Sequence, residues 1–274
     1  MNIKTCNLII NFNLRYLEEF KNIKNYETRE PSQYSINTVD NRIIFKKENL
    51  VKTTDLYKLY LDNGILYQEN YINNILVGTL KYNNKDIDLY LYNDNHYYEY
   101  VLSQYAYVYL IEHYTEYVYI HSSSIKYNDK VILLLARSGV GKSTLRNTFL
   151  TTTGSVCIND DKNIIGLVND ELHVFNSIYA GKEYISTNTC GTLSALVFLE
   201  QGQANKLIPI NGIEVLKRIL GQVKLANNKN KDSWNEILDK LLETKAYVYE
   251  NIISNHTATD LIHFLEGYNC ENKK

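Results

Sequence analysis

The sequence predicts an α/β protein with a ligand-binding core in its second half and an antiparallel β-rich region at its N-terminus. The first observation is a continuous apolar run, from Val131 to Leu135, that leads into a glycine-rich loop and then into a helical pattern. The second is a series of short apolar–polar runs in residues 1–96, separated by turn signals. A continuous apolar run is typical of a strand covered on both faces, whereas alternation is typical of hairpins with one exposed face. The expected domains are therefore residues 1–96 and residues 97–274.

The loop after the apolar run has the spacing of a phosphate-binding loop. Residues 136–143 fit the pattern G-x-x-x-x-G-K-[ST], with Ala136 in place of the first glycine. Gly139 and Gly141 carry no Cβ to obstruct backbone N–H groups that turn toward phosphate oxygens. The helix that Leu145 and Phe149 predict adds unpaired N–H donors and a partial positive charge at its N-terminus.

Each polar side chain of this pattern has an expected partner. Lys142 reaches the β- and γ-phosphates, and the Ser143 hydroxyl binds Mg²⁺. The sequence therefore predicts ATP, or another nucleoside triphosphate, together with Mg²⁺; the alternative is a glycine-rich turn without a ligand. The residues expected to bind the nucleotide are Arg137, Ser138, Gly139, Val140, Gly141, Lys142, Ser143 and Thr144.

Two adjacent carboxylates, Asp160 and Asp161, follow the next short strand at residues 155–159. In an α/β protein with a phosphate loop, an acidic residue at the end of a neighbouring strand is placed to hold Mg²⁺. A second carboxylate beside it can accept the proton of an acceptor hydroxyl. The alternative is a simple turn, because Asn-Asp-Asp is also common turn chemistry.

His121 lies in a strand-like run, residues 117–127, just before the phosphate-loop strand. We expect this run to lie beside that strand, which would bring the imidazole toward the loop. The alternative for a lone strand histidine is a hydrogen-bonded core residue.

Further patterns set the expected order of elements. A helix that is apolar all round is predicted at 98–114, a hairpin at 162–175, and a buried strand at 193–200 paired with 206–210. Capping patterns predict helices at 212–224 and 234–243, a last strand follows at 246–250, and a helix at 257–265 ends at Gly267. In the N-terminal region, strands are expected at 41–46, 65–68, 75–82 and 87–92, with turns at 62–64, 72–74 and 83–86.

Composition excludes several classes of protein. The formal net charge of −2 over 274 residues gives no reason to expect a nucleic-acid or membrane-surface partner. The four cysteines are scattered, without the spacing of a metal or redox site, and are expected as reduced thiols. No apolar stretch has the length of a membrane-spanning helix, and no secretory signal precedes the first strand, so a cytoplasmic location is expected.

From His121 onward the chain resembles the HPr kinase family, which are P-loop protein serine kinases with a fold related to phosphoenolpyruvate carboxykinase. The residues that carry the resemblance are His121 to Ile125, Ala136 to Thr144 and Asn159 to Asp161. Residues 179–183, 188–189, 196–201 and the helices after Pro209 look like the C-terminal half of the short members found near modified-peptide clusters, including the lasso-peptide serine kinases. The resemblance implies a P-loop kinase core on a mixed central sheet, so that residues 97–274 would form the catalytic domain. Residues 1–96 share only a β-rich character with these proteins and would serve packing or acceptor recognition.

The resemblance also implies roles for single residues. Asp160 would be the general base, with His121 against it, and Asp161 would share Mg²⁺ with Ser143. Lys142 would hold the transferred phosphates. Lys182, which follows Gly181, would contact phosphate or acceptor. The chain has no counterpart to the acidic-Arg-Gly signature of bifunctional HPr kinase/phosphorylases, so the resemblance leaves phosphorylase activity and HPr as the substrate open.

The predicted function is therefore ATP- and Mg²⁺-dependent phosphoryl transfer to a serine or threonine hydroxyl of a peptide or small protein. A small-molecule alcohol is an alternative acceptor, because the same groups suit any hydroxyl. The alternative that is not an enzyme is a nucleotide-binding module of a peptide-modification system, which would bind the nucleotide but transfer no phosphate. The presence of His121, Asp160 and Asp161 favours transfer, because binding alone needs no base. Homo-oligomerisation is left open.

Overall fold

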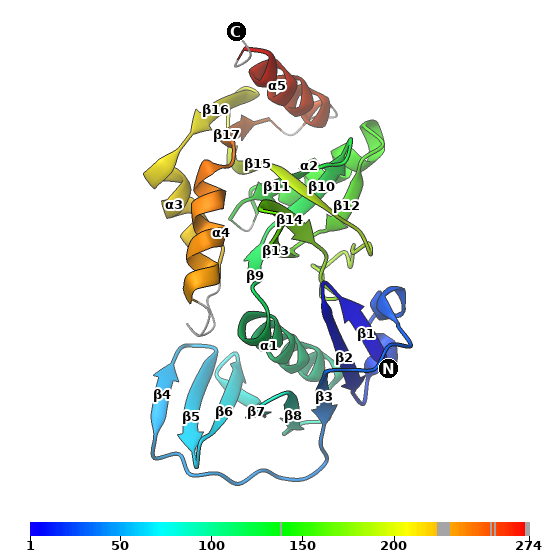
Figure 1. Ribbon diagram of the computed structural model, residues 1–274, viewed down its shortest axis with the longest axis vertical. Coiled ribbons are helices and arrows are strands. Elements are labelled where there is room, and N and C mark those ends of the chain that lie inside the picture. Colours follow the sequence, from blue (N-terminus) through cyan, green and yellow to red (C-terminus); the bar gives the residue numbers. More distant parts are fainter. Residues whose placement is uncertain (138, 224–230, 253, 255, 272–274) are drawn as a thin grey trace. The chain divides into compact units, whose positions relative to one another are not determined.

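The computed structural model describes residues 1–137, 139–223, 231–252, 254 and 256–271. The chain forms two compact units, Met1–Tyr114 and Thr115–Lys274. The expected boundary after residue 96 is therefore corrected, because helix α1 (His96–Tyr114) belongs to the first unit and packs on strands β3, β7 and β8. The fit between helix and sheet is close at Gly78, where an added Cβ would lie 2.6 Å from the Leu102 side chain of α1. Figure 1 shows the elements of both units.

An eight-stranded sheet forms the first unit, in the order β1-β2-β3-β8-β7-β6-β5-β4. Its strands are β1 (Asn2–Thr5), β2 (Leu8–Asn13), β3 (Tyr34–Thr38), β4 (Leu50–Thr53), β5 (Tyr57–Asp62), β6 (Ile65–Ile72), β7 (Ile75–Asn83) and β8 (Asp86–Leu91), with short 3₁₀ helices at Leu17–Glu19 and Ile23–Tyr26. The expected antiparallel sheet is only partly right. Strands β4 to β8 form an antiparallel meander, but β3 lies parallel to both β2 and β8. A parallel pair needs a long crossover, and residues 14–33 supply one between β2 and β3.

The predicted turns of this unit are confirmed by their backbone angles. Asn63 and Gly64, and likewise Asn73 and Asn74, have the positive φ values that a two-residue hairpin turn requires. The strand expected at 41–46 is wrong, because those residues join no sheet. Instead the Phe45 ring stacks on a Tyr ring of β6, with centroids 4.5 Å apart, while β4 forms the sheet edge a few residues later.

A curled nine-stranded sheet forms the second unit. Its main path is β12-β10-β11-β15-β14-β13-β9, and β17 extends it by pairing with β15 and β16. Its strands are β9 (Val118–His121), β10 (Ser123–Tyr127), β11 (Lys130–Leu135), β12 (Val156–Asn159), β13 (Lys162–Val168), β14 (Glu171–Phe175), β15 (Cys190–Gln201), β16 (Lys206–Ile210) and β17 (Ala246–Asn251). Strand β12 at one end of the path continues into β13 near the other end after only two residues. The sheet must therefore curl until these ends meet.

Two expected strand neighbours are corrected in this sheet. The run expected at 117–127 forms two strands: β10 pairs with β11 as expected, but β9, which carries His121, pairs with β13. Strand β16 pairs with β17 and not with β15, because β17 returns parallel to β15 and occupies the adjacent position. Strand β11 itself is parallel to β15 and antiparallel to β10, so the sheet is mixed.

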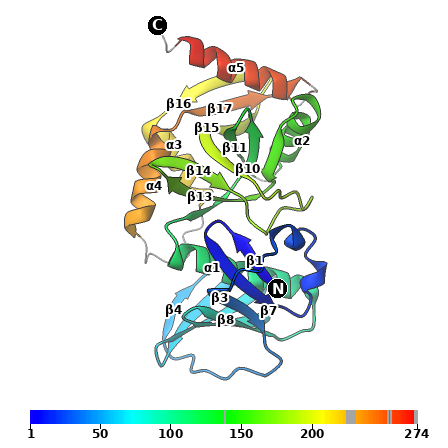
Figure 2. The ribbon, with the colours of Figure 1, turned by 45° about the vertical axis from the view of Figure 1, so that its right-hand side comes forward.

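Helices cover both faces of the central strands. Helices α2 (Lys142–Thr152) and α5 (Thr257–Glu271) share one buried apolar cluster with the sheet, and α3 (Gly212–Leu220) and α4 (Lys231–Glu243) share another. Figure 2 shows α2 and α4 on opposite sides of these strands. Among the described residues, no helix combines the length and the apolar character that crossing a membrane requires.

Two helix ends differ from expectation. Helix α3 ends at Leu220 rather than at residue 224, because Val223 forms a β-bridge with Ile120; residue 224 itself lies outside the described residues. Helix α5 continues through Gly267 to Glu271. A glycine inside a helix costs only about 1 kcal/mol, so it is a weak stop signal by itself.

One glycine of the second unit gives a direct test of its packing. A Cβ added to Gly166 on β13 would lie 2.0 Å from the Tyr117 ring, and that ring packs on Phe175. We expect Gly166→Ala to destabilise this unit by about 1–3 kcal/mol, the usual cost of overpacking. Gly221→Ala is the matched control, because φ at Gly221 is −73° and its nearest contact would be 3.5 Å. Denaturant unfolding followed by far-UV circular dichroism measures both. Equal stability of the two variants would contradict the packing described for Gly166.

Candidate functional site

The glycine loop, residues 136–141, joins β11 to α2. Gly139 has a φ of 85° and Gly141 a φ of 105°, and Gly141 is the N-cap of α2. Both values lie in the left-handed region, which favours glycine. Ala136 is not among the described residues with positive φ, so an alanine fits where the pattern has glycine. Ser138, an expected nucleotide contact, lies outside the described residues.

Three cationic or proton-donating side chains surround the carboxylate of Asp161. His121 Nε2 lies 2.7 Å from Asp161 Oδ1, Lys142 Nζ lies 3.4 Å from the same oxygen, and Lys162 Nζ lies 2.9 Å from Oδ2. These groups come from β9, from the first residue of α2 and from the start of β13. The structure thus brings the predicted lysine, histidine and second aspartate together.

This arrangement changes the ionisation of Asp161 and Lys142. Burial by itself raises the pKa of Asp161, but the hydrogen bond from His121 and the charge of Lys162 outweigh it and hold the pKa well below its usual range. Burial lowers the pKa of Lys142, against the opposing attraction of Asp161. Asp161 is therefore anionic at any physiological pH.

The structure corrects the expected hydrogen-bond partner of His121. The resemblance implied that His121 lies against Asp160, but its hydrogen bond goes to Asp161. The cause is strand register: β9 pairs antiparallel with β13, with His121 opposite Lys162, and the Ser122 N–H donates to the Asp161 carbonyl. An ionised carboxylate only accepts, so Nε2 carries the proton of this hydrogen bond. The alternative of a buried core histidine is wrong, because the His121 side chain is 45% exposed.

Asp160 is enclosed, with its side chain only 2% exposed. Its Oδ1 accepts the N–H of Gly181, and Arg146 Nη1 lies 3.6 Å from its Oδ2. The second separation is an ion pair rather than a hydrogen bond. Burial raises the pKa of Asp160, while the Gly181 N–H and Arg146 act in the opposite direction. The two adjacent aspartates therefore differ: Asp160 is buried with a raised pKa, and Asp161 is half-buried with a lowered one.

Asn159 fixes the turn that carries both carboxylates. Its Oδ1 accepts the N–H groups of Asp161 and Lys162, and its Nδ2 donates to the carbonyls of Ser177 and Tyr179. The Asn159 side chain is fully buried, so these bonds replace the water it has lost. Asn-Asp-Asp is thus a turn as well as a carboxylate pair, and the turn sets which way each carboxylate points.

Several expected residues make weaker contributions. Lys182, Ser143 and Thr144 are exposed, as is Arg137 at the start of the loop. Lys182 lies in the segment whose Gly181 touches both aspartates: a Cβ on Gly181 would lie 2.9 Å from Asp161 Cβ and 3.0 Å from Asp160 Oδ2. The backbone of Gly181 therefore lies close to both carboxylates, while the neighbouring Lys182 side chain is exposed to solvent.

Arg146 is a site residue that sequence reasoning missed, as it missed Lys162 beside Asp161. Its side chain is 1% exposed, on the face of α2 that also buries Leu145 and Phe149. The available signal was a cation four residues after Lys142, at a position where the helical period predicts burial. Charged residues are almost never fully buried without a partner, so that position already implied a carboxylate nearby.

Among the described residues, no group of three or more His, Cys, Asp or Glu side chains has the arrangement of a metal site. Asp161 and Ser143, the two residues expected to bind Mg²⁺, would supply one carboxylate and one hydroxyl oxygen. Mg²⁺ is usually held by one or two carboxylates plus substrate phosphates rather than by an all-protein cage.

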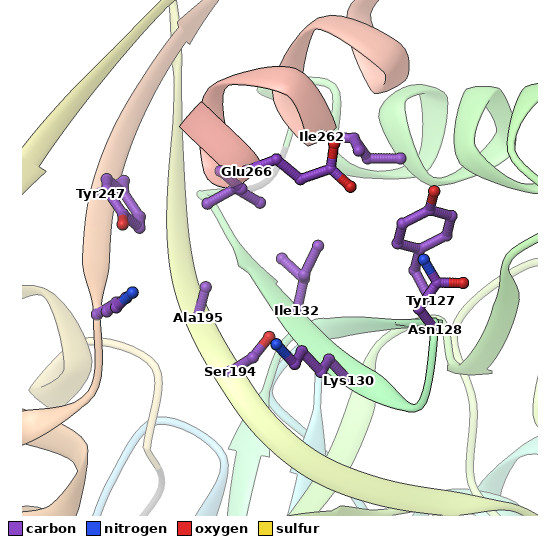
Figure 3. Close-up of a pocket in the computed structure, with 11 residues that line it drawn as sticks. Tyr127, Asn128, Lys130, Ile132, Ser194, Ala195, Tyr247, Ile262 and Glu266 are labelled. Carbon is purple, nitrogen blue, oxygen red and sulfur yellow. The ribbon is translucent and has the colours of Figure 1, made fainter. Parts of the chain in front are cut away.

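A cavity of about 490 Å³ lies at the other end of β11 from the glycine loop. Figure 3 shows its lining: Ile132, Ala195 and Tyr247 come from the sheet, and Ile262 and Glu266 come from α5. It contains none of the predicted site residues.

Cysteine reactivity offers a check on the strand that leads to Asp160. Cys157 on β12 is 1% exposed, and burial raises its pKa to about 12, whereas Cys190 is exposed. A raised pKa lowers the thiolate fraction at pH 8, and the thiolate is the reacting species. We expect iodoacetamide to label Cys190 rapidly and Cys157 only after unfolding, as read by peptide mass spectrometry. Labelling of Cys157 in the folded protein at the rate of Cys190 would contradict the described burial of β12.

Comparison with known proteins finds similarity to solved structures. No protein-family model matches the chain, and no curated protein matches it. Among solved structures, the chain is similar to the Hpr(Ser) kinase/phosphatase from Coxiella burnetii, with a TM-score of 0.33 and 11% sequence identity over 57% of this chain and 96% of that one. By its own helices and strand pairing, the chain is a mixed α/β protein with mixed sheets.

Proposed function

We propose that the second unit is an ATP- and Mg²⁺-dependent phosphotransferase that phosphorylates a serine or threonine hydroxyl of a peptide or small protein. The observation that carries the proposal is the 3.4 Å contact between Lys142, the first residue of α2, and Asp161, after β12. It joins a glycine loop of phosphate-binding pattern to a carboxylate pair. Phosphoryl transfer needs positioning, charge neutralisation and one base in the same place, and little else from the protein.

The glycine loop would bind the nucleotide phosphates. The positive φ of Gly139 and Gly141 supports a loop whose N–H groups turn toward an anion, and the N-terminus of α2 adds its dipole. Lys142 is half-buried and its pKa is lowered by that burial, so a phosphate group would offset the cost. In the proposal Lys142 exchanges its contact with Asp161 for the transferred phosphate.

The donor set at this point fits Mg²⁺. Asp161 stays ionised because its pKa is held low, and the Ser143 hydroxyl follows Lys142 at the start of the same helix. Carboxylate and hydroxyl oxygens are the ligands that this hard cation prefers. The cation would neutralise charge on the phosphates, while Asp161 and Ser143 would hold it.

Asp160 is the proposed base. Its pKa is raised by burial, which makes the carboxylate a better proton acceptor than an exposed one. Gly181 fixes one oxygen, and Arg146 lies beyond hydrogen-bonding distance of the other, so Oδ2 keeps its capacity to accept a proton. The contact of His121 with Asp161 favours a second assignment, in which this more exposed pair takes the proton.

The acceptor is proposed from the resemblance to short peptide-modifying kinases, together with the exposed side chains of Lys182 and His121 near the carboxylates. The first unit is proposed to recognise the acceptor or to serve packing. A small-molecule alcohol would use the same groups. A nucleotide-binding module without turnover would use the glycine loop alone.

One experiment tests the function and the choice of base together. The protein is incubated with γ-labelled ATP, Mg²⁺ and a panel of serine- and threonine-containing peptides, and the wild type is compared with His121→Ala. With Asp160 as the base, His121→Ala should lower the transfer rate by less than about tenfold, because His121 then only supports Asp161. A loss of about 10²-fold or more would assign the proton to the His121–Asp161 pair. ATP binding without transfer to any acceptor would contradict the proposed function.

A further inference from the structure

Arg146 is a buried cation that the proposed chemistry leaves unexplained. It lies one helical turn after Lys142 on α2, so the two side chains emerge from the same side of the helix. Its side chain is 1% exposed, and it is among the largest fully buried side chains of the described chain. A guanidinium cannot be deprotonated in a protein, so its burial requires compensating carboxylates.

Two carboxylates from different segments meet Arg146. Nη2 donates to Glu183 Oε2 at 2.6 Å, and Nη1 lies 3.6 Å from Asp160 Oδ2. Nε and Nη2 also donate to Asn147 Oδ1, at 3.2 and 2.8 Å, which fixes the plane of the guanidinium. Arg146 therefore joins α2, the turn after β12 and the segment that contains Glu183.

The segment Gly181–Glu183 is attached at both of its ends. Gly181 donates its N–H to Asp160 Oδ1, and its missing Cβ lets its backbone lie against both aspartates. Glu183 is held by Arg146 and lies 3.5 Å from Asn147 Nδ2. Lys182 lies between these two attachments with its charge in solvent. A change at Arg146 would release the Glu183 end and remove the cation that faces Asp160.

We propose that Arg146 is a positioning residue that clamps the Gly181–Glu183 segment and Asp160 to the helix that begins with Lys142. The clamp fixes the carboxylate relative to the phosphate-binding end of α2, and at 3.6 Å Arg146 makes no hydrogen bond to Oδ2, the oxygen proposed to take the proton. This inference rests on the proposed phosphotransferase function for its catalytic consequence, but the clamp itself is a property of the fold.

The first arm of the test needs no activity. Hydrogen exchange is measured by mass spectrometry on peptides that cover residues 176–189, without nucleotide, for the wild type, Arg146→Met, Arg146→Lys and Glu183→Gln. We expect faster exchange in this segment for Arg146→Met, a smaller effect for Arg146→Lys, and an intermediate effect for Glu183→Gln. If Arg146→Met does not fold, Arg146→Lys and Glu183→Gln still decide the result. Unchanged exchange in the variants that fold would overturn the clamp.

The second arm separates positioning from structure. A misplaced base lowers kcat but not nucleotide affinity, so Arg146→Met should lower kcat by about 10–100-fold with an ATP Kd within about twofold of the wild type. Arg146→Lys should restore part of kcat.

Arg218→Met is the matched control, because Arg218 also bridges two glutamates, Glu200 and Glu214, away from this site. Equal losses in Arg146→Met and Arg218→Met would overturn the positioning role. A wild type that transfers no phosphate would remove the proposed function, and the exchange arm would then confirm or overturn the clamp by itself.

Discussion

Asp160→Asn should lower the rate of phosphoryl transfer by about 10²–10⁴-fold, the usual contribution of a general base, while ATP affinity changes by less than about threefold. The amide has the shape of the carboxylate and can still accept the Gly181 N–H, but it cannot take a proton from an acceptor hydroxyl. The hydrogen bond and the ion pair of the Asp160 side chain go to Gly181 and Arg146 rather than to the glycine loop, so nucleotide binding should depend only weakly on its charge.

Single-turnover transfer and equilibrium ATP binding measure the two effects separately. The substitution also removes a charge that faces Arg146, so the melting temperature of Asp160→Asn must be recorded beside the wild type. A variant that folds, binds ATP and transfers phosphate at the wild-type rate would exclude Asp160 as the base. Loss of ATP binding comparable to the loss of rate would mean that Asp160 belongs to the nucleotide site instead.

Lys142→Met should weaken ATP binding and reduce transfer together, by about 10²-fold or more in kcat/KM. Methionine keeps the apolar stem of lysine and removes only the ammonium group, so packing is preserved. In the proposal this ammonium group compensates the transferred phosphate, and in the described structure it contacts Asp161 at 3.4 Å.

Lys142→Met and Asp160→Asn are therefore expected to differ in ATP affinity, which only Lys142→Met should weaken. Calorimetric titration with ATP and Mg²⁺ gives the affinity, and the same titration of Lys126→Met provides a lysine control from the same unit, on β10 and bonded to the Cys190 carbonyl. Unchanged ATP affinity in Lys142→Met would show that the glycine loop does not bind the phosphates. Equal weakening in Lys126→Met would show a general effect of lost positive charge.

Local signals in the sequence predicted the parts of the fold that local chemistry decides. The turns at Asn63-Gly64 and Asn169-Asp170 formed as expected, because positive φ is accessible to few residue types other than Gly, Asn and Asp. Strand β11 and helix α2 were predicted for a similar reason: a continuous apolar run and a helical period have few other solutions.

Long-range pairing could not be predicted from the same signals. His121 lies beside Asp161 because β9 pairs with β13, and nothing in either strand names its partner. The burial of Arg146 depends on Asp160 and Glu183, which are 14 and 37 residues away. Apolar periodicity identified α1 as a buried helix, but not that it packs in the first unit.

The most direct test of the central claim is the fate of the γ-phosphate. ATP labelled with ¹⁸O at the γ-phosphate is incubated with the wild-type protein, Mg²⁺ and serine- and threonine-containing peptides, and the labelled phosphate is located by mass spectrometry. The proposed function predicts that it is recovered as a phosphoester on a serine or threonine side chain, in a ratio of one ester to each ATP consumed. Recovery only as inorganic phosphate, or no consumption of ATP despite binding, would contradict it.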